Sequence, residues 1–279
     1  IENKKEVGIS LSNMYLYDGI AGIAIFFAAL SQKIKKKSYQ IMEKNLIDKL
    51  VKYTLSDLDS QKSYMTGAFA GESSIIYTYI ILYYIKKDMK YIKYAELHEK
   101  KMHKLLQNDS KYDFLLGNAG AIIVFLKLFK ITSNKKYLCH AKEAADYLIL
   151  KAIASNDGIY WPTANSCIQE GLAHGESGFS LCFAELYKET HDYKYLKIAL
   201  NALMFENSFY DDKSNNWVDE EHKKNKNTRA YWCHGAGGIA LTRKLLLHIL
   251  DNNALECISI DYYNALKRIE KSTNYNMNS

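Results

Sequence analysis

Most of the residues in this sequence that could do chemistry stand inside five short glycine-containing windows. The windows hold acidic, imidazole and thiol side chains, namely Asp18, Glu72, Asp113, His174, Glu176, Cys233 and His234. Zinc takes thiolate and imidazole ligands, and an imidazole with its pKa near about 6.5 suits general acid–base work. Paired carboxylates could instead cleave a glycosidic bond. Which chemistry applies depends on how the windows are arranged in space.

The windows recur along the chain. They read YLYDGIAG from Tyr15, GAFAGESS from Gly67, DFLLGNAG from Asp113, GLAHGESG from Gly171 and YWCHGAGG from Tyr231. Twelve of the 14 glycines lie in them, and intervals of 46 to 60 residues separate the anchor glycines Gly19, Gly71, Gly117, Gly175 and Gly235. Self-similarity at such a spacing indicates a repeat architecture.

Each window is followed by an apolar stretch and then by an amphipathic one. The apolar stretches are typical of helices that are buried on most of their surface, and they cover Ile23–Leu30, Ile75–Ile85, Ala121–Phe129, Phe179–Leu186 and Ile239–Leu247. The amphipathic segments carry charges at helical spacing and cover Lys44–Leu55, Ile92–Leu106, Lys136–Leu150, Tyr193–Phe205 and Asp261–Lys271. We therefore predict pairs of inner and outer helices, with the inner helices starting after Gly22, Ser74, Gly120, Gly178 and Gly238.

Inner helices ringed by outer helices make an all-α fold, an α/α toroid with the glycine turns gathered at one end. Glycine in such a turn permits close backbone approach and positive φ before the helix starts. The fold would bring the acidic, imidazole and thiol side chains of all five windows to a common mouth. A single proline, Pro162, is consistent with a helical chain.

Composition excludes several classes of protein. The chain has 279 residues, 48% of them hydrophobic and 24% charged, which is ordinary globular usage. A net charge of +6 with only three arginines argues against a nucleic-acid partner. The longest apolar runs are shorter than the roughly 18 residues of a transmembrane helix. Without a signal peptide, the five cysteines indicate free thiols in a cytoplasmic protein; association with a membrane in a biosynthetic complex is left open.

Three of the windows carry a family resemblance. The run WCHGAGGI from Trp232, the run LYDGIAGI from Leu16, and Ala173-His174-Gly175 resemble the LanC-like cyclase domain of lanthionine synthetases, most closely the C-terminal cyclase region of the class II, LanM-type enzymes. The resemblance implies a seven-repeat α/α barrel with a catalytic zinc ion. It also implies zinc-dependent addition of a peptide cysteine thiol to dehydroalanine or dehydrobutyrine, which forms the thioether rings of lantibiotics. A dehydrated precursor peptide and a dehydratase domain or protein are the implied partners.

The resemblance also implies roles for individual residues. Cys233 matches a zinc ligand, His174 a general acid/base, Asp113 an acid that orients the site, and Arg229 an arginine near the metal. His234 is interpreted as a substrate-facing group. Simpler interpretations stay open: His174 could cap the next helix, Asp113 is a common residue before a helix, and Arg229 follows a run of charges.

The sequence departs from the family pattern at the metal. The family binds zinc with a Cys of the fifth repeat and with an adjacent Cys-His pair that opens the sixth, and only Cys233 has a counterpart here. We therefore expect residues 1–279 to be one LanC-like domain that is incomplete at its C-terminal end, with about five of the seven repeats. We also expect that this chain alone neither holds zinc tightly at Cys233 nor forms rings, because a catalytic zinc site normally takes three protein ligands.

Two alternatives to a cyclase remain. The first is a non-catalytic remnant that binds peptide in its bowl. The second is an α/α-toroid glycosidase that uses Glu72, Glu176, Asp18 or Asp113 as paired carboxylates. The adjacent Cys139-His140 pair lacks a following glycine, and we interpret it as ordinary packing of an outer helix.

Overall fold

The chain folds into two concentric layers of helices in a computed structural model, which describes residues 13–58, 64–162, 168–218, 230–250 and 255–277. The inner helices are α1 (Ile20–Lys33), α3 (Glu72–Lys86), α5 (Asn118–Thr132), α7 (Glu176–Thr190) and α10 (Ala236–Leu246). The outer helices are α2 (Lys37–Leu55), α4 (Lys90–Met102), α6 (Lys135–Lys151), α8 (Tyr193–Asn207) and α11 (Leu255–Met277). A short 3-10 helix, η1 (His103–Asn108), follows α4.

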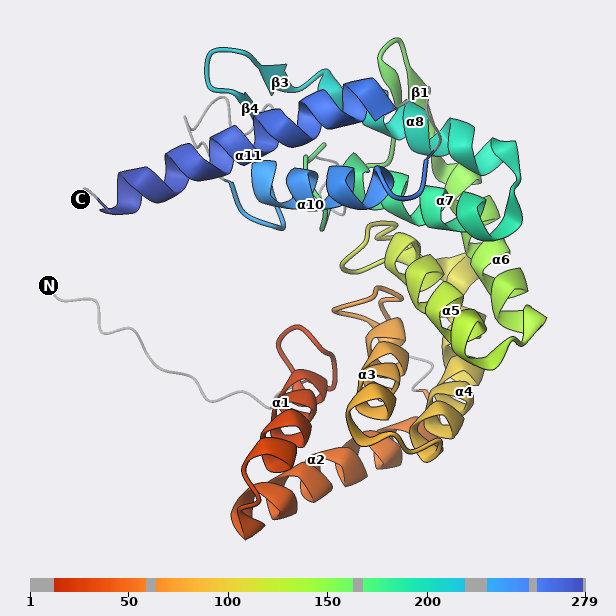
Figure 1. Ribbon diagram of the computed structural model, residues 1–279. Helices are drawn as coiled ribbons and strands as arrows, with labels where there is room; N and C mark the ends of the chain where they lie inside the picture. Colours follow the sequence, from red (N-terminus) through yellow and green to blue (C-terminus); the bar gives the residue numbers. More distant parts are fainter. Residues whose placement is uncertain (1–12, 59–63, 163–167, 219–229, 251–254, 278–279) are drawn as a thin grey trace, which may run out of the picture.

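Each inner helix packs against its own outer helix and against the next inner helix, in the order α1, α3, α5, α7, α10. Figure 1 shows the five pairs following one another around an arc. The predicted all-α architecture of the α/α-toroid class is thereby confirmed. Among the described residues, two short hairpins are the β structure: β1 (Ile153–Ser155) with β2 (Gly158–Tyr160), and β3 (Tyr210–Asp211) with β4 (Asn216–Trp217).

The predicted starts of the inner helices are three residues too late. Each helix begins directly after its anchor glycine, so that the last residue of a window, a glycine in four of the five, lies inside the first helical turn. The reason is that the loop folds back over this turn. At Gly120, for example, a Cβ atom would stand 2.1 Å from the carbonyl oxygen of Phe114 and 2.4 Å from the backbone nitrogen of Ala68. Four of the anchor glycines have ordinary extended backbone, and the expected positive φ is found at one anchor, Gly235.

The windows bind one another through their backbones at one end of the inner layer. The amides of Leu16 and Tyr17 donate to the carbonyl of Phe69, at 3.1 and 2.9 Å. The next link runs from Ala70 to Leu115 (3.0 Å), and the one after that from Leu115 to Ala173 (3.1 Å). The first four loops therefore form a continuous hydrogen-bonded series, which fixes the end of the arc at which their side chains meet.

A buried arginine links the fourth helix pair to the fifth. Arg243 of α10 is fully buried and donates to Glu206 Oε2 (2.9 Å), Ser177 Oγ (3.0 Å) and Asn207 Oδ1 (3.1 Å). Its Nε also donates to Asp261 of α11 at 3.2 Å. Because each polar group finds a partner, the buried charge is compensated and α7, α8, α10 and α11 are held together. In the part of the chain that the structure describes, no helix is long and apolar enough to cross a membrane.

Candidate active site at the loop end of the inner helices

His174 and Asp113 form a partly buried pair between two neighbouring windows. His174 Nδ1 lies 2.9 Å from Asp113 Oδ2, and the other carboxylate oxygen accepts the amide of Leu116 at 2.6 Å. The Asp113 side chain is 2% exposed, whereas that of His174 is 20% exposed. A carboxylate accepts, so Nδ1 carries the proton of this bond, and the lone pair is left on Nε2. The buried carboxylate thus orients an imidazole that solvent can reach.

His234 and Cys233 lie beside this pair. The rings of His234 and His174 stack with their centroids 5.4 Å apart. Cys233 is half-buried and packs against an apolar cluster formed by Ala70, Leu115 and Ala173. Three of the windows therefore contribute polar side chains to one place, whereas the repeat predicted this of all five. Arg229 lies outside the described residues.

Close backbone approach brings the fourth and fifth windows together. Gly171 has φ +100°, and a Cβ atom there would lie 2.9 Å from the carbonyl oxygen of Cys233 and 3.1 Å from Cα of His234. Gly235 has φ +84°, a conformation that L-residues with side chains rarely adopt. These two glycines allow the Cys233-His234 turn to sit directly against the loop that carries His174.

Trp232 connects the fifth window to the first two. Its ring centroid is 6.1 Å from that of Tyr17 and 5.8 Å from that of Phe69. Its side chain is 37% exposed, while Trp161 and Trp217 are fully buried. Trp232 therefore places an aromatic ring beside His174, Cys233 and His234, at the loop end of the inner helices that we call the mouth.

A largely apolar cavity of about 400 Å³ lies on the inner helices below the mouth. Phe114, Leu172 and Trp232 line it, and each is an immediate or next-but-one neighbour of Asp113, His174 or Cys233. Lys130 and Glu185, which also line the cavity, form an ion pair at 3.3 Å. Each of the three windows thus places a polar side chain in the His174 cluster and an apolar one in the cavity.

The glutamates that follow the anchor glycines are structural. Glu72 is fully buried and accepts hydrogen bonds from Tyr15 (3.0 Å) and Tyr53 (2.7 Å), while His98 Nε2 lies 3.0 Å from its second oxygen. Glu176 is also buried, and burial together with the charge of Glu206 raises its pKa well above the ordinary range. Neither carboxylate reaches the mouth, so the pair that the glycosidase alternative requires is not presented to a substrate.

Among the described residues, no three metal donors gather at Cys233. Catalytic zinc takes three protein ligands, and His174 Nδ1 is committed to Asp113. Across the described part of the chain, three His, Cys, Asp or Glu donors come within 4.8 Å of one another at one place, formed by His103, His140 and Glu143. That place is in the outer layer, away from the mouth. Zinc at Cys233 therefore stays a prediction.

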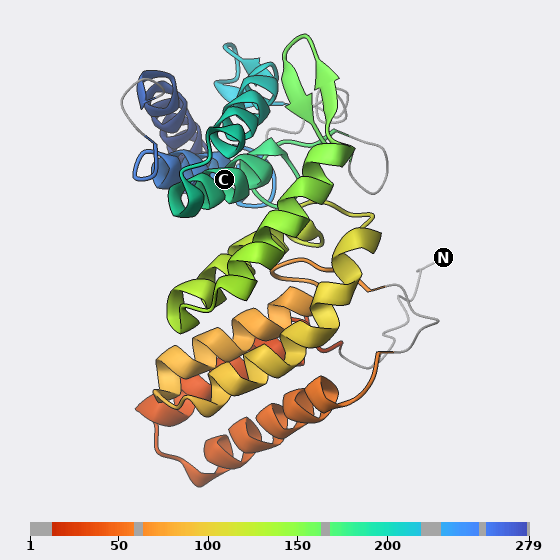
Figure 2. The same cartoon turned by 90° about the vertical axis from the view of Figure 1, so that its right-hand side faces the viewer.

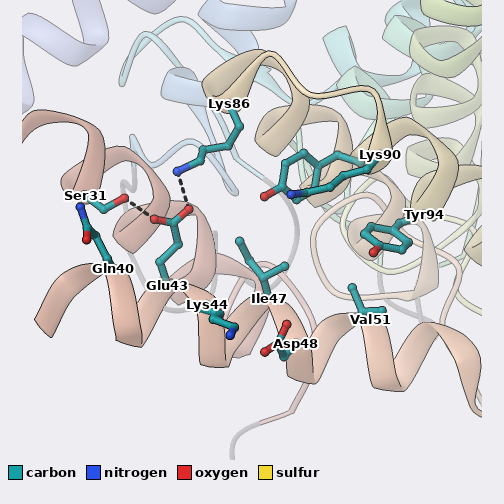
Figure 3. Close-up of a pocket in the computed structure, with 11 residues that line it drawn as sticks. Ser31, Gln40, Glu43, Lys44, Ile47, Asp48, Val51, Lys86, Lys90 and Tyr94 are labelled. Carbon is teal, nitrogen blue, oxygen red and sulfur yellow. Dashed lines mark hydrogen bonds and ion pairs between the residues drawn. The ribbon is translucent and has the colours of Figure 1, made fainter. Parts of the chain in front are cut away.

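A second cavity, of about 550 Å³, opens at the far end of the arc between α2, α3 and α4. Figure 3 shows Glu43 bonded there to both Ser31 and Lys86, the latter at 2.6 Å. Lys44, Lys90 and Tyr94 also line the space. No residue that the sequence predicted as functional lies in it, and its central carboxylate is already compensated.

Comparison with known proteins decides the family. The family model described as lanthionine synthetase C-like protein matches residues 10–277. The chain belongs to this family. This lanthionine synthetase C-like chain is 26% identical over 238 residues to a lacticin 481/lactococcin biosynthesis protein of Lactococcus lactis subsp. lactis. The match covers 82% of this chain and 23% of that protein, so the chain spans less than a quarter of its relative.

Solved structures agree on the fold. Nisin cyclase superposes with a TM-score of 0.68 at 19% identity, covering 95% of this chain and 71% of that one. An unsaturated glucuronyl hydrolase specific for heparin reaches a TM-score of 0.55 at 12% identity, with coverage of 88% and 72%. The α-1,6-mannanase of Salegentibacter sp. HEL1_6 reaches 0.54 at 13%, with coverage of 95% and 79%. At these identities the likeness shows the shared helical architecture alone.

Sequence reasoning missed the apolar half of the site. The sequence does contain a signal for it: Trp232, Phe114 and Leu172 each stand one or two residues from a polar candidate in the same window. The interpretation of Cys139-His140 as ordinary helix packing was incomplete. His140 stacks on His103 with ring centroids 3.8 Å apart and lies 2.7 Å from Glu99.

Proposed function

We propose that this chain is a lanthionine-forming cyclase module, which adds a peptide cysteine thiol to dehydroalanine or dehydrobutyrine. The observation that carries the proposal is the His174–Asp113 pair, which lies beside Cys233 and His234 above an aromatic-walled cavity. A dehydrated precursor peptide is the proposed substrate, and a dehydratase domain or protein is the proposed source of that peptide.

The chemistry requires a proton to leave the thiol and a proton to reach carbon. The S–H bond breaks, the sulfur bonds to Cβ, and the electrons of the C=C bond move toward Cα. The resulting enolate then takes a proton at Cα, so the addition consumes and releases no net proton. With Asp113 on Nδ1, the Nε2 atom of His174 accepts the thiol proton and can return it to Cα. Asp113 stabilises the imidazolium that forms in between.

The second candidate is a peptide-binding module without catalysis. It is favoured because the described residues do not bring three metal ligands together at Cys233. The apolar cavity and the exposed face of Trp232 would still bind an apolar peptide side chain. Both candidates use the same mouth and differ in whether bond formation follows binding.

One assay separates the candidates. The chain is incubated with Zn²⁺ and a synthetic peptide that contains one dehydroalanine and one cysteine. Remaining thiol is counted by alkylation and mass spectrometry, and binding is followed by tryptophan fluorescence, with Trp232→Phe as the control. Thiol loss that disappears in His174→Asn supports the cyclase. Binding with all thiol retained supports the second candidate, and the absence of both contradicts both.

A further inference from the structure

The outer layer carries a histidine–carboxylate cluster that the cyclase chemistry does not use. His103 begins η1 directly after α4, and His140 and Glu143 stand on α6. One ligand atom from each of the three residues lies within 4.8 Å of the others. Figure 2, which faces the outer layer, shows α4 and α6 as successive helices of this layer.

Local geometry brings these side chains together. His140 and Glu143 are three residues apart on α6 and therefore share one face of the helix. His103 Nε2 lies 2.7 Å from Glu143 Oε2, and its ring stacks on that of His140 with an interplanar angle of 17°. The side chains of His103 and Glu143 are 38% and 46% exposed, so an ion in solution can reach them.

A buried carboxylate orients His140 from behind. Glu99 Oε1 lies 2.7 Å from His140 Nδ1, and Glu99 Oε2 lies 2.7 Å from Lys136 Nζ. The Glu99 side chain is 1% exposed, so this arrangement is fixed within the packed layer. A neutral His140 with its proton on Nδ1, facing this carboxylate, would offer the lone pair of Nε2 to a metal ion. A carboxylate behind the ring is the usual support of a metal-binding histidine.

We propose that His103, His140 and Glu143 bind a divalent zinc-class ion, with water as the fourth ligand. Two imidazoles and one carboxylate form a donor set that zinc accepts. The ion would replace the contact between His103 Nε2 and Glu143 Oε2, and the two stacked rings would turn apart to meet it. The ion would join η1 of the second repeat to α6 of the third. Because the ligands stand on the outer surface and apart from the mouth, the ion would take no part in the proposed thiol addition.

The test is a titration of the purified, metal-stripped chain with Zn²⁺ alone, followed by calorimetry. We expect one ion per chain, with affinity at least about tenfold lower in His140→Ala and in the exposed variants His103→Asn and Glu143→Gln. Glu99→Gln should weaken binding about 10- to 100-fold through loss of the supporting carboxylate. Cys139→Ser is the matched control, since it changes the neighbouring residue without removing a ligand, and it should bind as the unmodified chain does.

Cys233→Ser separates this site from a zinc site at the mouth. Zinc binding that survives Cys233→Ser and falls in His103→Asn supports the proposal, whatever the chain does to peptides. Bound Co²⁺ should show nitrogen and oxygen ligation without a thiolate charge-transfer band. The proposal is overturned if the chain binds no Zn²⁺, or if His103→Asn and Glu143→Gln bind it unchanged. Circular dichroism of each variant checks that the fold is retained.

Discussion

Two histidines of this protein, one at the mouth and one in the outer layer, each lie against a buried carboxylate in different surroundings. His174 Nδ1 forms a hydrogen bond with Asp113 at 2.9 Å, and His140 Nδ1 lies 2.7 Å from Glu99. His174 adjoins windows that line a cavity, whereas His140 stacks on a second histidine on the outer surface. A histidine beside a buried carboxylate therefore does not indicate one particular function. The groups around the other ring nitrogen, Nε2, determine whether the histidine can transfer a proton or bind a metal ion.

The largest expected difference between His174 and His140 is in the rate of the proposed catalytic step. In a form of the protein that forms rings, His174→Asn should lower the rate of thiol addition about 100-fold or more, because general acid–base catalysis contributes roughly 10²- to 10⁴-fold. The matched change His140→Asn should leave the rate within about twofold. Alkylation of the remaining thiol measures both. Equal losses in the two variants would show that His174 acts through the fold rather than through proton transfer.

A backbone change should disturb the mouth and leave the outer cluster intact. Gly171→Ala places a methyl group 2.9 Å from the carbonyl oxygen of Cys233 at a φ of +100°. We expect a loss of about 1–3 kcal/mol in the free energy of unfolding, measured with urea. Zinc affinity of the outer cluster should not change. A variant as stable as the parent would show that the Cys233-His234 turn moves away at little cost.

Glu176, the acidic residue nearest to His174 in the sequence, should make the stability of the fold depend on pH. Glu176 has a raised pKa in the folded protein because it is buried and lies near Glu206. Above the unfolded carboxyl pKa of about 4.3, the unfolded chain releases a proton that the folded chain keeps, so this residue lowers stability as pH rises toward its folded pKa. Glu176→Gln should flatten that decline. Urea unfolding at several pH values measures it, and an unchanged profile would contradict a protonated Glu176.

The smallest expected effect concerns the aromatic surface of the mouth. Trp232→Ala should weaken binding of an apolar peptide about tenfold, because it removes an exposed ring that adjoins Tyr17 and Phe69. Anisotropy of a labelled peptide measures the affinity. The thermal midpoint should change little, since the side chain is already 37% exposed. Unchanged affinity would place the peptide elsewhere on the protein.

The repeat made much of the fold predictable. Glycine windows and alternating apolar and amphipathic segments specify helix pairs locally, and the five predicted pairs are present. The helix starts were wrong by three residues because contact between loops, which no local pattern reveals, determines where the turn ends. The β1–β2 hairpin was missed although Asn156-Asp157-Gly158 is a turn signal between two apolar stretches.

The two histidine clusters differ in how far the sequence could predict them. His174, Cys233 and His234 stand in windows that the repeat places at equivalent positions, so their proximity could be expected. His103 stands in η1 and His140 in α6, at positions that do not correspond in the repeat, and the packing of these two elements brings them together. Arg243 was missed for the same reason, because its partners Glu206, Asn207 and Asp261 come from two other helices.

The contact of Trp232 with Tyr17 has a consequence for the order in which the protein assembles. The loop hydrogen bonds join neighbouring repeats, so each repeat can dock soon after it leaves the ribosome. The Tyr17–Trp232 contact instead joins two ends of the described arc and closes a very long loop, which slows its formation. The mouth would therefore be completed only after the fifth window has been synthesised. A nascent chain would have a folded scaffold before it could engage a peptide.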